Sequence, residues 1–191
     1  MFKLLIDDHT DLRLLEIRHA DDLYNLTNQS RNTLREWLFW VDFTQSPKDS
    51  MIFIESTMKQ FCQNNGFQAG IWYKGELAGV IGLHAVNWTN KSTSIGYWLG
   101  EKFQGKGLMT NACDAVVEYC FNELKLNRIE IRVATENHKS LAIPNRLGFQ
   151  NEGCIKSAEW LYDKYVDHNI FGLIKDDYES IKSVMKKSAS Y

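Results

Sequence analysis

The spacing of apolar residues changes from strand-like alternation to a helical repeat near the middle of the chain. The run Ser94–Leu99 is typical of a β-strand, whereas Leu108, Ala112 and Val116 recur every four residues, as on one face of an α-helix. Glycines at positions 105 and 107 lie between the two patterns and allow a tight turn. We therefore predict a strand, a glycine-containing loop and a helix over residues 94–124.

Comparable patterns predict the remaining elements. We expect strands over residues 12–17, 67–73, 76–85, 93–99, 128–134, 150–160 and 166–174. We expect helices over residues 20–38 and 47–63, a short helix that ends at Gly148, and a polar, fraying helix from residue 175. This order of elements predicts an α/β (α+β) fold with a single mixed, mostly antiparallel central sheet flanked by helices.

Composition narrows the class of protein. The chain has 191 residues, of which 44% are hydrophobic and 24% charged, so we expect one globular domain over residues 1–191 with a core of about 12–174. No apolar run approaches the roughly 18 residues of a membrane span, and the N-terminus turns acidic before a signal sequence could form. We therefore expect a cytoplasmic protein.

Charge and residue spacing disfavour several kinds of partner. A net charge of −2 disfavours direct binding of nucleic acid, which needs a basic surface. The four cysteines contain no CxxC pair, and the five histidines are scattered without metal-ligand spacing. We therefore expect reduced thiols and no metal.

Three interpretations of the glycine loop are open at this point. A plain strand-to-helix connection needs no ligand. A nucleotide P-loop is favoured by the pattern over residues 100–106, but Gly107 stands where a Ser or Thr hydroxyl would hold Mg²⁺. A pyrophosphate loop needs no metal, because backbone N–H groups and the positive end of a helix neutralise the phosphates.

A second cluster decides for the pyrophosphate loop. Arg128–Ala134 alternates like a half-buried strand, and it is followed by Asn137-x-x-Ser140 and a short helix ending Leu-Gly-Phe. This order resembles the GCN5-related N-acetyltransferase (GNAT) superfamily over about residues 12–174. The runs Gly96–Gly100, Asn151–Cys154 and Ala158-Glu159 are most similar to the RimJ/RimL-like branch, which acetylates the N-terminal alanine or serine of ribosomal proteins.

The resemblance implies acetyl-CoA as cosubstrate, with Asn137 holding its pantetheine arm. The backbone at Trp98-Leu99 could supply an N–H group to the oxyanion of the reaction. Met109 stands where the loop of the family usually ends in Gly or Ala. The residues expected to bind acetyl-CoA are Trp98, Leu99, Gln104, Gly105, Lys106, Gly107, Leu108, Met109 and Asn137.

The resemblance also implies catalytic residues. Ser140 occupies the position of a hydrogen-bond donor to the leaving thiolate, although helix capping would also explain Asn137 and Ser140. Glu159 matches the position of the general base, with Glu101 in reserve and bulk water or an inert carboxylate as alternatives. Trp37 and Trp40 either pack in the core or form a wall of the acceptor slot.

These features predict an acetyl-CoA-dependent N-acetyltransferase that acts by direct attack in a ternary complex. The expected acceptor is the N-terminal amine of a ribosomal or other protein. The alternatives are a small amine, such as a polyamine, an amino acid or an antibiotic, and a CoA-binding sensor without turnover. We expect no membrane partner, and a homodimer stays open.

Overall fold

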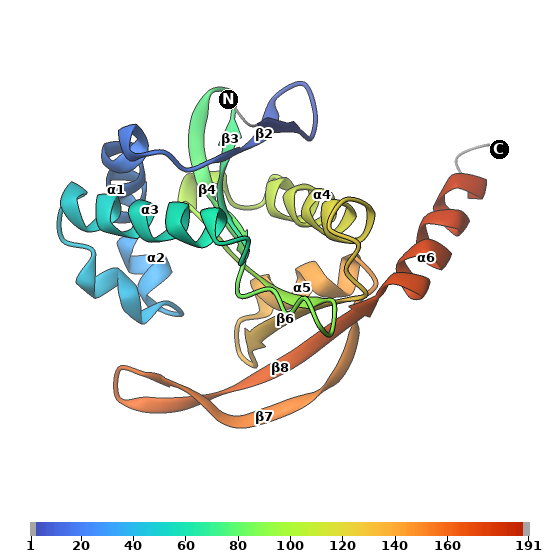
Figure 1. The fold of residues 1–191 in the computed structure, drawn as a ribbon. Coiled ribbons are helices and arrows are strands. Elements are labelled where there is room, and N and C mark those ends of the chain that lie inside the picture. Colours follow the sequence, from blue (N-terminus) through green and yellow to red (C-terminus); the bar gives the residue numbers. More distant parts are fainter. Residues whose placement is uncertain (1–2, 189–191) are drawn as a thin grey trace.

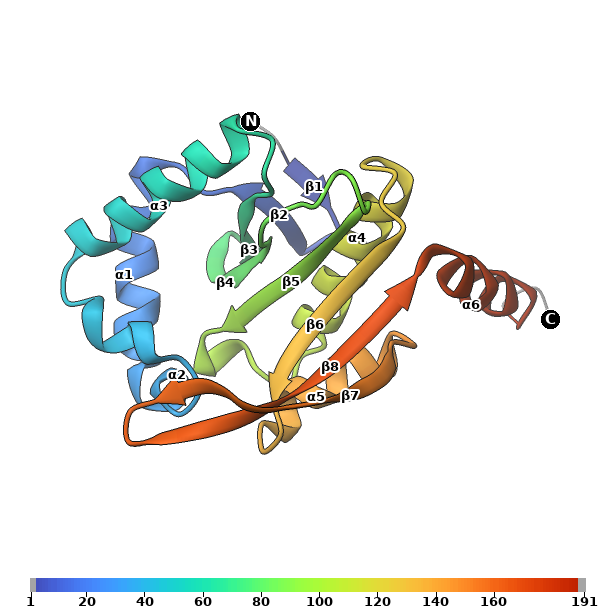
Figure 2. The ribbon, with the colours of Figure 1, turned by 60° about the horizontal axis from the view of Figure 1, so that its bottom comes forward.

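The computed structural model describes the backbone of residues 3–188 and the side chains as far as residue 184. The first two and the last three residues of the predicted domain lie outside this range. A twisted sheet runs through the middle of the molecule, with α1 (Ala20–Gln29) and α3 (Pro47–Cys62) to one side and α4 (Leu108–Asn122) and α5 (His138–Arg146) to the other (Figures 1 and 2). The predicted architecture is therefore confirmed.

Eight strands form one sheet in the order β1-β2-β3-β4-β5-β6-β8-β7. Neighbouring strands are antiparallel except β5 and β6, which are parallel. The strands are β1 (Lys3–Leu5), β2 (Thr10–Leu14), β3 (Gln68–Tyr73), β4 (Glu76–Leu83), β5 (Ser92–Leu99), β6 (Arg128–Ala134), β7 (Gln150–Leu161) and β8 (Lys164–Ile174).

Local sequence signals set the ends of several elements. Ser46 and Asp49 form a capping box at the start of α3, with Pro47 at a position where its missing N–H group is harmless. Lys74 and Gly75 both have positive φ, as a two-residue hairpin turn between β3 and β4 requires. These boundaries agree with the sequence patterns because they depend on neighbouring residues only.

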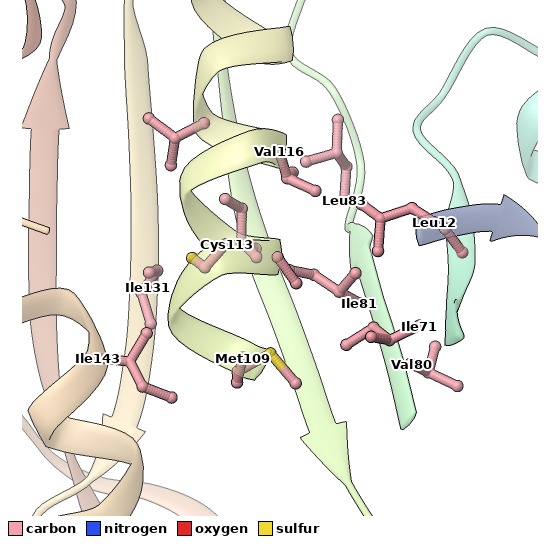
Figure 3. Packing of buried hydrophobic residues seen from close by; sticks show 14 of the residues in the cluster. Leu12, Ile71, Val80, Ile81, Leu83, Met109, Cys113, Val116, Ile131 and Ile143 are labelled. Atoms are coloured by element: carbon pink, nitrogen blue, oxygen red, sulfur yellow. The ribbon is translucent and has the colours of Figure 1, made fainter. Parts of the chain in front are cut away.

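The core lies on both sides of the sheet, under α4 on one side and under α1 and α3 on the other. Val116 of α4 lies beside Leu83 of β4 among the buried side chains, and Cys113 and Ile81 belong to the same cluster (Figure 3). Met109, at the start of α4, is 5% exposed and belongs to this cluster. The side chain that replaces the usual Gly or Ala is therefore accommodated by packing into the core.

The N-terminal helical segment differs from the prediction of one helix over residues 20–38. Helix α1 ends at Gln29, α2 covers Arg31–Arg35, and a 3₁₀ turn, η2, follows at Phe39–Phe43 after the extended residue Leu38. Further 3₁₀ turns are η1 (Ile17–His19) and η3 (Glu101–Phe103). The break coincides with Ser30, whose hydroxyl oxygen accepts the backbone N–H of Glu101 at 3.0 Å.

The two ends of the described chain also differ from the prediction. β1 has no strong sequence signal and forms by pairing with β2. The predicted polar tail forms α6 (Lys175–Ser188), and its Tyr178 is buried, with its ring centre 5.1 Å from that of Phe121. This contact anchors the helix that was predicted from residue 175 and that its polar composition indicated would fray.

Candidate active site

The glycine loop opens directly into α4. Gly105 and Gly107 have φ values of 74° and 76°, in the left-handed region that glycine adopts easily. A Cβ atom added at either position would meet nothing within 4 Å. The first main-chain hydrogen bond of α4 runs from Asn111 N to Gly107 O, so the preceding N–H groups have no acceptor within the helix. The arrangement suits an anion, as the sequence predicted.

A cleft of ≈ 330 Å³ near the tip of the β7–β8 hairpin is separate from the loop, whereas a larger cleft of ≈ 1060 Å³ contains it. The larger cleft joins the glycine loop, the end of β5, the start of α5 and the α2 region. Its lining residues are Thr33, Leu34, Glu36, Trp37, Leu38, Tyr97, Trp98, Leu99, Gln104, Gly105, Lys106, Gly107, Leu108, Met109, Thr110, Asn111, Glu136, Asn137, His138, Lys139, Ser140, Ala142, Ile143 and Arg146. All nine residues predicted to bind the cosubstrate are among them.

The sheet opens at this cleft. β5 and β6 pair only from Ser92 to Ser94 on the β5 side. His84 N donates to Ser94 O, and Gly100 N donates to Ala78 O, so the even-numbered backbone groups of this part of β5 face β4. The amide of Leu99 therefore points toward the gap between β5 and β6, where it can reach a ligand.

Ser140 and Asn137 meet at the start of α5. Asn137 Oδ1 accepts the Ser140 N–H at 3.1 Å, which is the predicted capping contact. Both residues also line the cleft, so capping and ligand contact are compatible. Ser140 Oγ lies 3.4 Å from the hydroxyl oxygen of Tyr97, a residue that the sequence patterns treated only as part of a strand.

Neither predicted base lines the cleft. Glu159 lies on β7, where its Oε2 is 3.1 Å from Nε2 of His168. Glu101 is exposed in η3, which precedes the glycine loop. Two other carboxylates, Glu36 and Glu136, do line the cleft. Glu136 had a weak sequence signal, because it lies shortly after the predicted strand over residues 128–134 and is the residue before Asn137. Glu36 had no such signal.

The two predicted acceptor-site tryptophans have different surroundings. Trp37 lines the cleft, whereas Trp40 does not. The Trp40 ring packs at 5.7 Å against Trp98, which does line it. Trp40 therefore supports a residue of the cleft wall, and contact of either tryptophan with an acceptor stays a prediction.

Basic side chains are a feature of the cleft lining. Lys106, His138, Lys139 and Arg146 line it, and Lys139 Nζ donates to Gln104 Oε1 at 3.2 Å. This hydrogen bond joins the start of α5 to the glycine loop. The positive charge of Lys106, Lys139 and Arg146 suits phosphate groups, and of the four residues the sequence analysis singled out only Lys106.

The four cysteines divide into two pairs. Cys113 and Cys120 of α4 are buried, and burial raises the pKa of Cys120 to about 12, so its thiol is protonated at neutral pH. Cys62 and Cys154 are exposed. Over the described residues, no group of three or more His, Cys, Asp or Glu side chains could hold a metal ion, and no helix is long and apolar enough to cross a membrane.

Comparison with known proteins identifies the family. Residues 10–150 match the acetyltransferase (GNAT) domain. The chain belongs to the GNAT family. It is an acyltransferase, an N-acetyltransferase of the acetyl-CoA-dependent GNAT type, which confirms the resemblance noted from the sequence.

Relatives and solved structures of this family match nearly the whole chain. The Bacillus subtilis (strain 168) protein named "Putative ribosomal N-acetyltransferase YdaF" is 37% identical over 95% of this chain and 100% of its own. The ribosomal-protein-serine acetyltransferase of Escherichia coli (strain K12) is 30% identical over 90% of this chain and 96% of its own. The structure of RimL, a ribosomal L7/L12 alpha-N-protein acetyltransferase in complex with coenzyme A, has a TM-score of 0.89 and 27% identity, covering 92% of this chain and 99% of that one.

Proposed function

We propose that this GNAT enzyme acetylates the α-amine of the N-terminal serine or alanine of a protein, with a ribosomal protein as the acceptor. The observation that carries the proposal is the continuous cleft that runs from the glycine loop past Ser140 to the aromatic wall at Trp37 and Trp98. Both substrates can meet in such a space, as direct attack requires. The names of two relatives support a protein N-terminus as the acceptor.

The cosubstrate would lie with its pyrophosphate over residues 104–109. Free N–H groups and the positive end of α4 would hold the phosphates without a divalent metal, with Lys106 nearby. Asn137 is proposed to hold the pantetheine arm. The arm would then pass Ser140 into the gap between β5 and β6, which brings the thioester to the amide of Leu99.

The amine nitrogen then attacks the thioester carbonyl carbon. An N-terminal amine has a pKa of about 8, so much of it carries a proton that must leave before the attack. Glu159 is proposed to accept that proton, and because it lies outside the cleft lining, a water molecule would relay it. Glu101 remains the second candidate.

The Leu99 amide would stabilise the oxyanion that forms on the carbonyl oxygen. When the carbon–sulfur bond breaks, the electron pair stays on sulfur, and Ser140 Oγ–H would donate a hydrogen bond to the thiolate. The nitrogen loses its remaining extra proton to water as the intermediate collapses, the thiolate takes up a proton from water, and the acetylated amine and CoA then leave. In this scheme Ser140 keeps its own proton, because a serine hydroxyl is a far weaker acid than a thiol.

A panel of acceptors tests the function. The purified protein would be incubated with acetyl-CoA and peptides that begin with Ser or Ala, the same peptides with a blocked N-terminus and an internal lysine, and spermidine. Thiol release gives the rate, and mass spectrometry locates the acetyl group. We expect turnover only with free N-termini.

Other outcomes would contradict the proposal in recognisable ways. Preferred turnover of spermidine would indicate a small-amine acetyltransferase. Tight binding of acetyl-CoA without acetylation of any amine would indicate a sensor. Mass spectrometry of cellular N-termini with and without this protein would then identify the natural acceptor.

A further inference from the structure

Tyr97 makes two hydrogen bonds to one residue on a different element. Its hydroxyl group donates to the backbone carbonyl oxygen of Ser140 at 3.2 Å. The same hydroxyl oxygen accepts the Ser140 Oγ–H at 3.4 Å. Tyr97 lies on β5 and Ser140 in the first turn of α5, and both line the cleft. The Tyr97 side chain is thus hydrogen-bonded to both the backbone carbonyl and the hydroxyl group of Ser140.

Pro144 explains why the Ser140 carbonyl is available. In an α-helix this carbonyl would accept the N–H of the residue four positions later. That residue is Pro144, inside α5, and proline has no N–H group. Leaving such an acceptor unpaired in a partly buried site would be destabilising. The phenol of Tyr97 supplies the missing donor.

The two hydrogen bonds depend on each other. The phenol has one proton, and that proton is directed at the Ser140 carbonyl, so only the lone pairs of its oxygen are left for the serine hydroxyl. Burial raises the pKa of Tyr97 above its ordinary range, so the phenol keeps its proton at neutral pH. Ser140 Oγ–H is therefore the donor in the second bond.

We propose that Tyr97 is a positioning residue for Ser140, fixing the rotamer from which the hydroxyl group turns toward the sulfur of CoA. This inference rests on the function proposed above. During transfer, the Ser140 Oγ–H exchanges one acceptor for another, from the oxygen of Tyr97 to the developing thiolate. No covalent bond of either residue is made or broken. The weak 3.4 Å contact suits this exchange, because little is lost when it opens.

Replacement of Tyr97 by phenylalanine removes both hydrogen bonds. The additional substitution Pro144→Ala separates the effect of the bond to the carbonyl from the effect of the bond to the hydroxyl group. Alanine restores the helical N–H to the Ser140 carbonyl but offers nothing to Ser140 Oγ. A merely structural role of Tyr97 would therefore be rescued in Tyr97→Phe/Pro144→Ala, whereas a role at the hydroxyl group would not. The single variant Pro144→Ala is the matched control, and thermal unfolding of each variant verifies its fold.

We expect Tyr97→Phe to lower kcat about 3- to 10-fold with little change in KM for acetyl-CoA. A Ser140 side chain that is no longer held in one of its three staggered rotamers would occupy the productive rotamer about a third of the time, which alone accounts for about threefold. The defect should persist in Tyr97→Phe/Pro144→Ala. It should disappear in a Ser140→Ala background, where there is no hydroxyl group to position. Wild-type kcat in Tyr97→Phe, or full rescue by Pro144→Ala, would overturn the proposal.

A binding measurement keeps this test independent of the acceptor. CoA and desulfo-CoA would be titrated into each protein at neutral and alkaline pH, where the thiol of CoA ionises. We expect the preference of the wild type for CoA to grow with pH and to shrink in both Tyr97→Phe and Ser140→Ala. An undiminished preference in Tyr97→Phe would overturn the role of Tyr97, even if no N-terminal amine proves to be a substrate.

Discussion

Replacement of Gly107 by alanine tests the glycine loop most directly. Gly107 has a φ of 76°, and a Cβ atom added there would meet nothing within 4 Å. The expected effect is therefore conformational rather than a clash within the protein. A non-glycine residue in the left-handed region costs about 1–2 kcal/mol.

That cost should reduce the affinity for acetyl-CoA. The loop is exposed, so an alanine-containing loop can relax to a negative φ in the free protein. Binding must then restore the turn, and 1–2 kcal/mol corresponds to a loss of about 5- to 30-fold in affinity. The new methyl group also faces the proposed pyrophosphate, which can only add to the loss. KM for the acceptor amine should change much less.

Gly75→Ala is the matched control. Gly75 has a φ of 84°, and a methyl group added there would also meet nothing within 4 Å, but this glycine lies in the β3–β4 turn and does not line the cleft. Gly75→Ala should lower the free energy of unfolding by about 1–2 kcal/mol, the same conformational cost as that expected at Gly107, without affecting the affinity for acetyl-CoA.

Isothermal titration calorimetry with acetyl-CoA gives the affinities of the three proteins, and thermal unfolding gives their stabilities. Unchanged affinity in folded Gly107→Ala would refute the reasoning, and so would a requirement for Mg²⁺ in the wild type. Equal losses of affinity in both variants would also refute it, because the effect would then come from general destabilisation.

Individual side chains provide three further tests. Ser140→Ala should lower kcat about 10- to 100-fold, which is the effect expected from the loss of a hydrogen bond to a charged group, and should change KM less. Ser56→Ala, on the exposed face of α3, is the control and should leave both kcat and KM unchanged. Equal kcat in the two variants would leave Ser140 only a capping role. Glu159→Gln should lower kcat by about 10²-fold, with a smaller loss at high pH where the amine deprotonates unaided; a pH profile parallel to that of the wild type would exclude it as the base. The hydrogen bonds from Arg128 hold the pKa of Glu152 below its ordinary value of 4.5, so this pair stabilises the fold above that pH and stops doing so as the pH falls through the lowered pKa. Glu152→Gln should therefore lower the Tm at pH 7, by an amount that shrinks as the pH falls below 4.5, and a shift in thermal unfolding that stays constant as the pH falls would contradict the reasoning.

The sequence predicted those features that depend on neighbouring residues. The glycine loop before α4 and the Asn137 cap of α5 are both encoded within a few positions, and both agree with the structure. Features that depend on distant segments were missed. The break of the first helix at Ser30 involves a hydrogen bond from Glu101, 71 positions later, which no periodicity reveals.

The same distinction applies to the cleft. The partnership of Tyr97 with Ser140 links positions 43 apart, so each residue alone had only a local interpretation. Glu36 lines the cleft from the C-cap position of α2, within the segment predicted as one continuous helix over residues 20–38. Glu159, chosen by resemblance to the family, and Glu101, chosen for its place just after the strand and next to the glycine loop, lie outside the cleft lining, so their roles depend on the experiments above.

The position of β8 between β6 and β7 has a consequence for the order in which the chain can fold. β1 to β5 pair with neighbours in sequence order, whereas β7 has only β8 as its partner. During synthesis, β7 therefore leaves the ribosome before any strand exists to pair with it. Tyr162, in the turn after β7, donates a hydrogen bond to the carbonyl oxygen of Leu38, which lines the cleft, across 124 positions. Such long-range contacts form late, because their loop-closure entropy is large. The glycine loop can thus form on a nascent chain in which Leu38 of the cleft still lacks its contact with the last hairpin, and full activity should arise only when that hairpin joins the sheet.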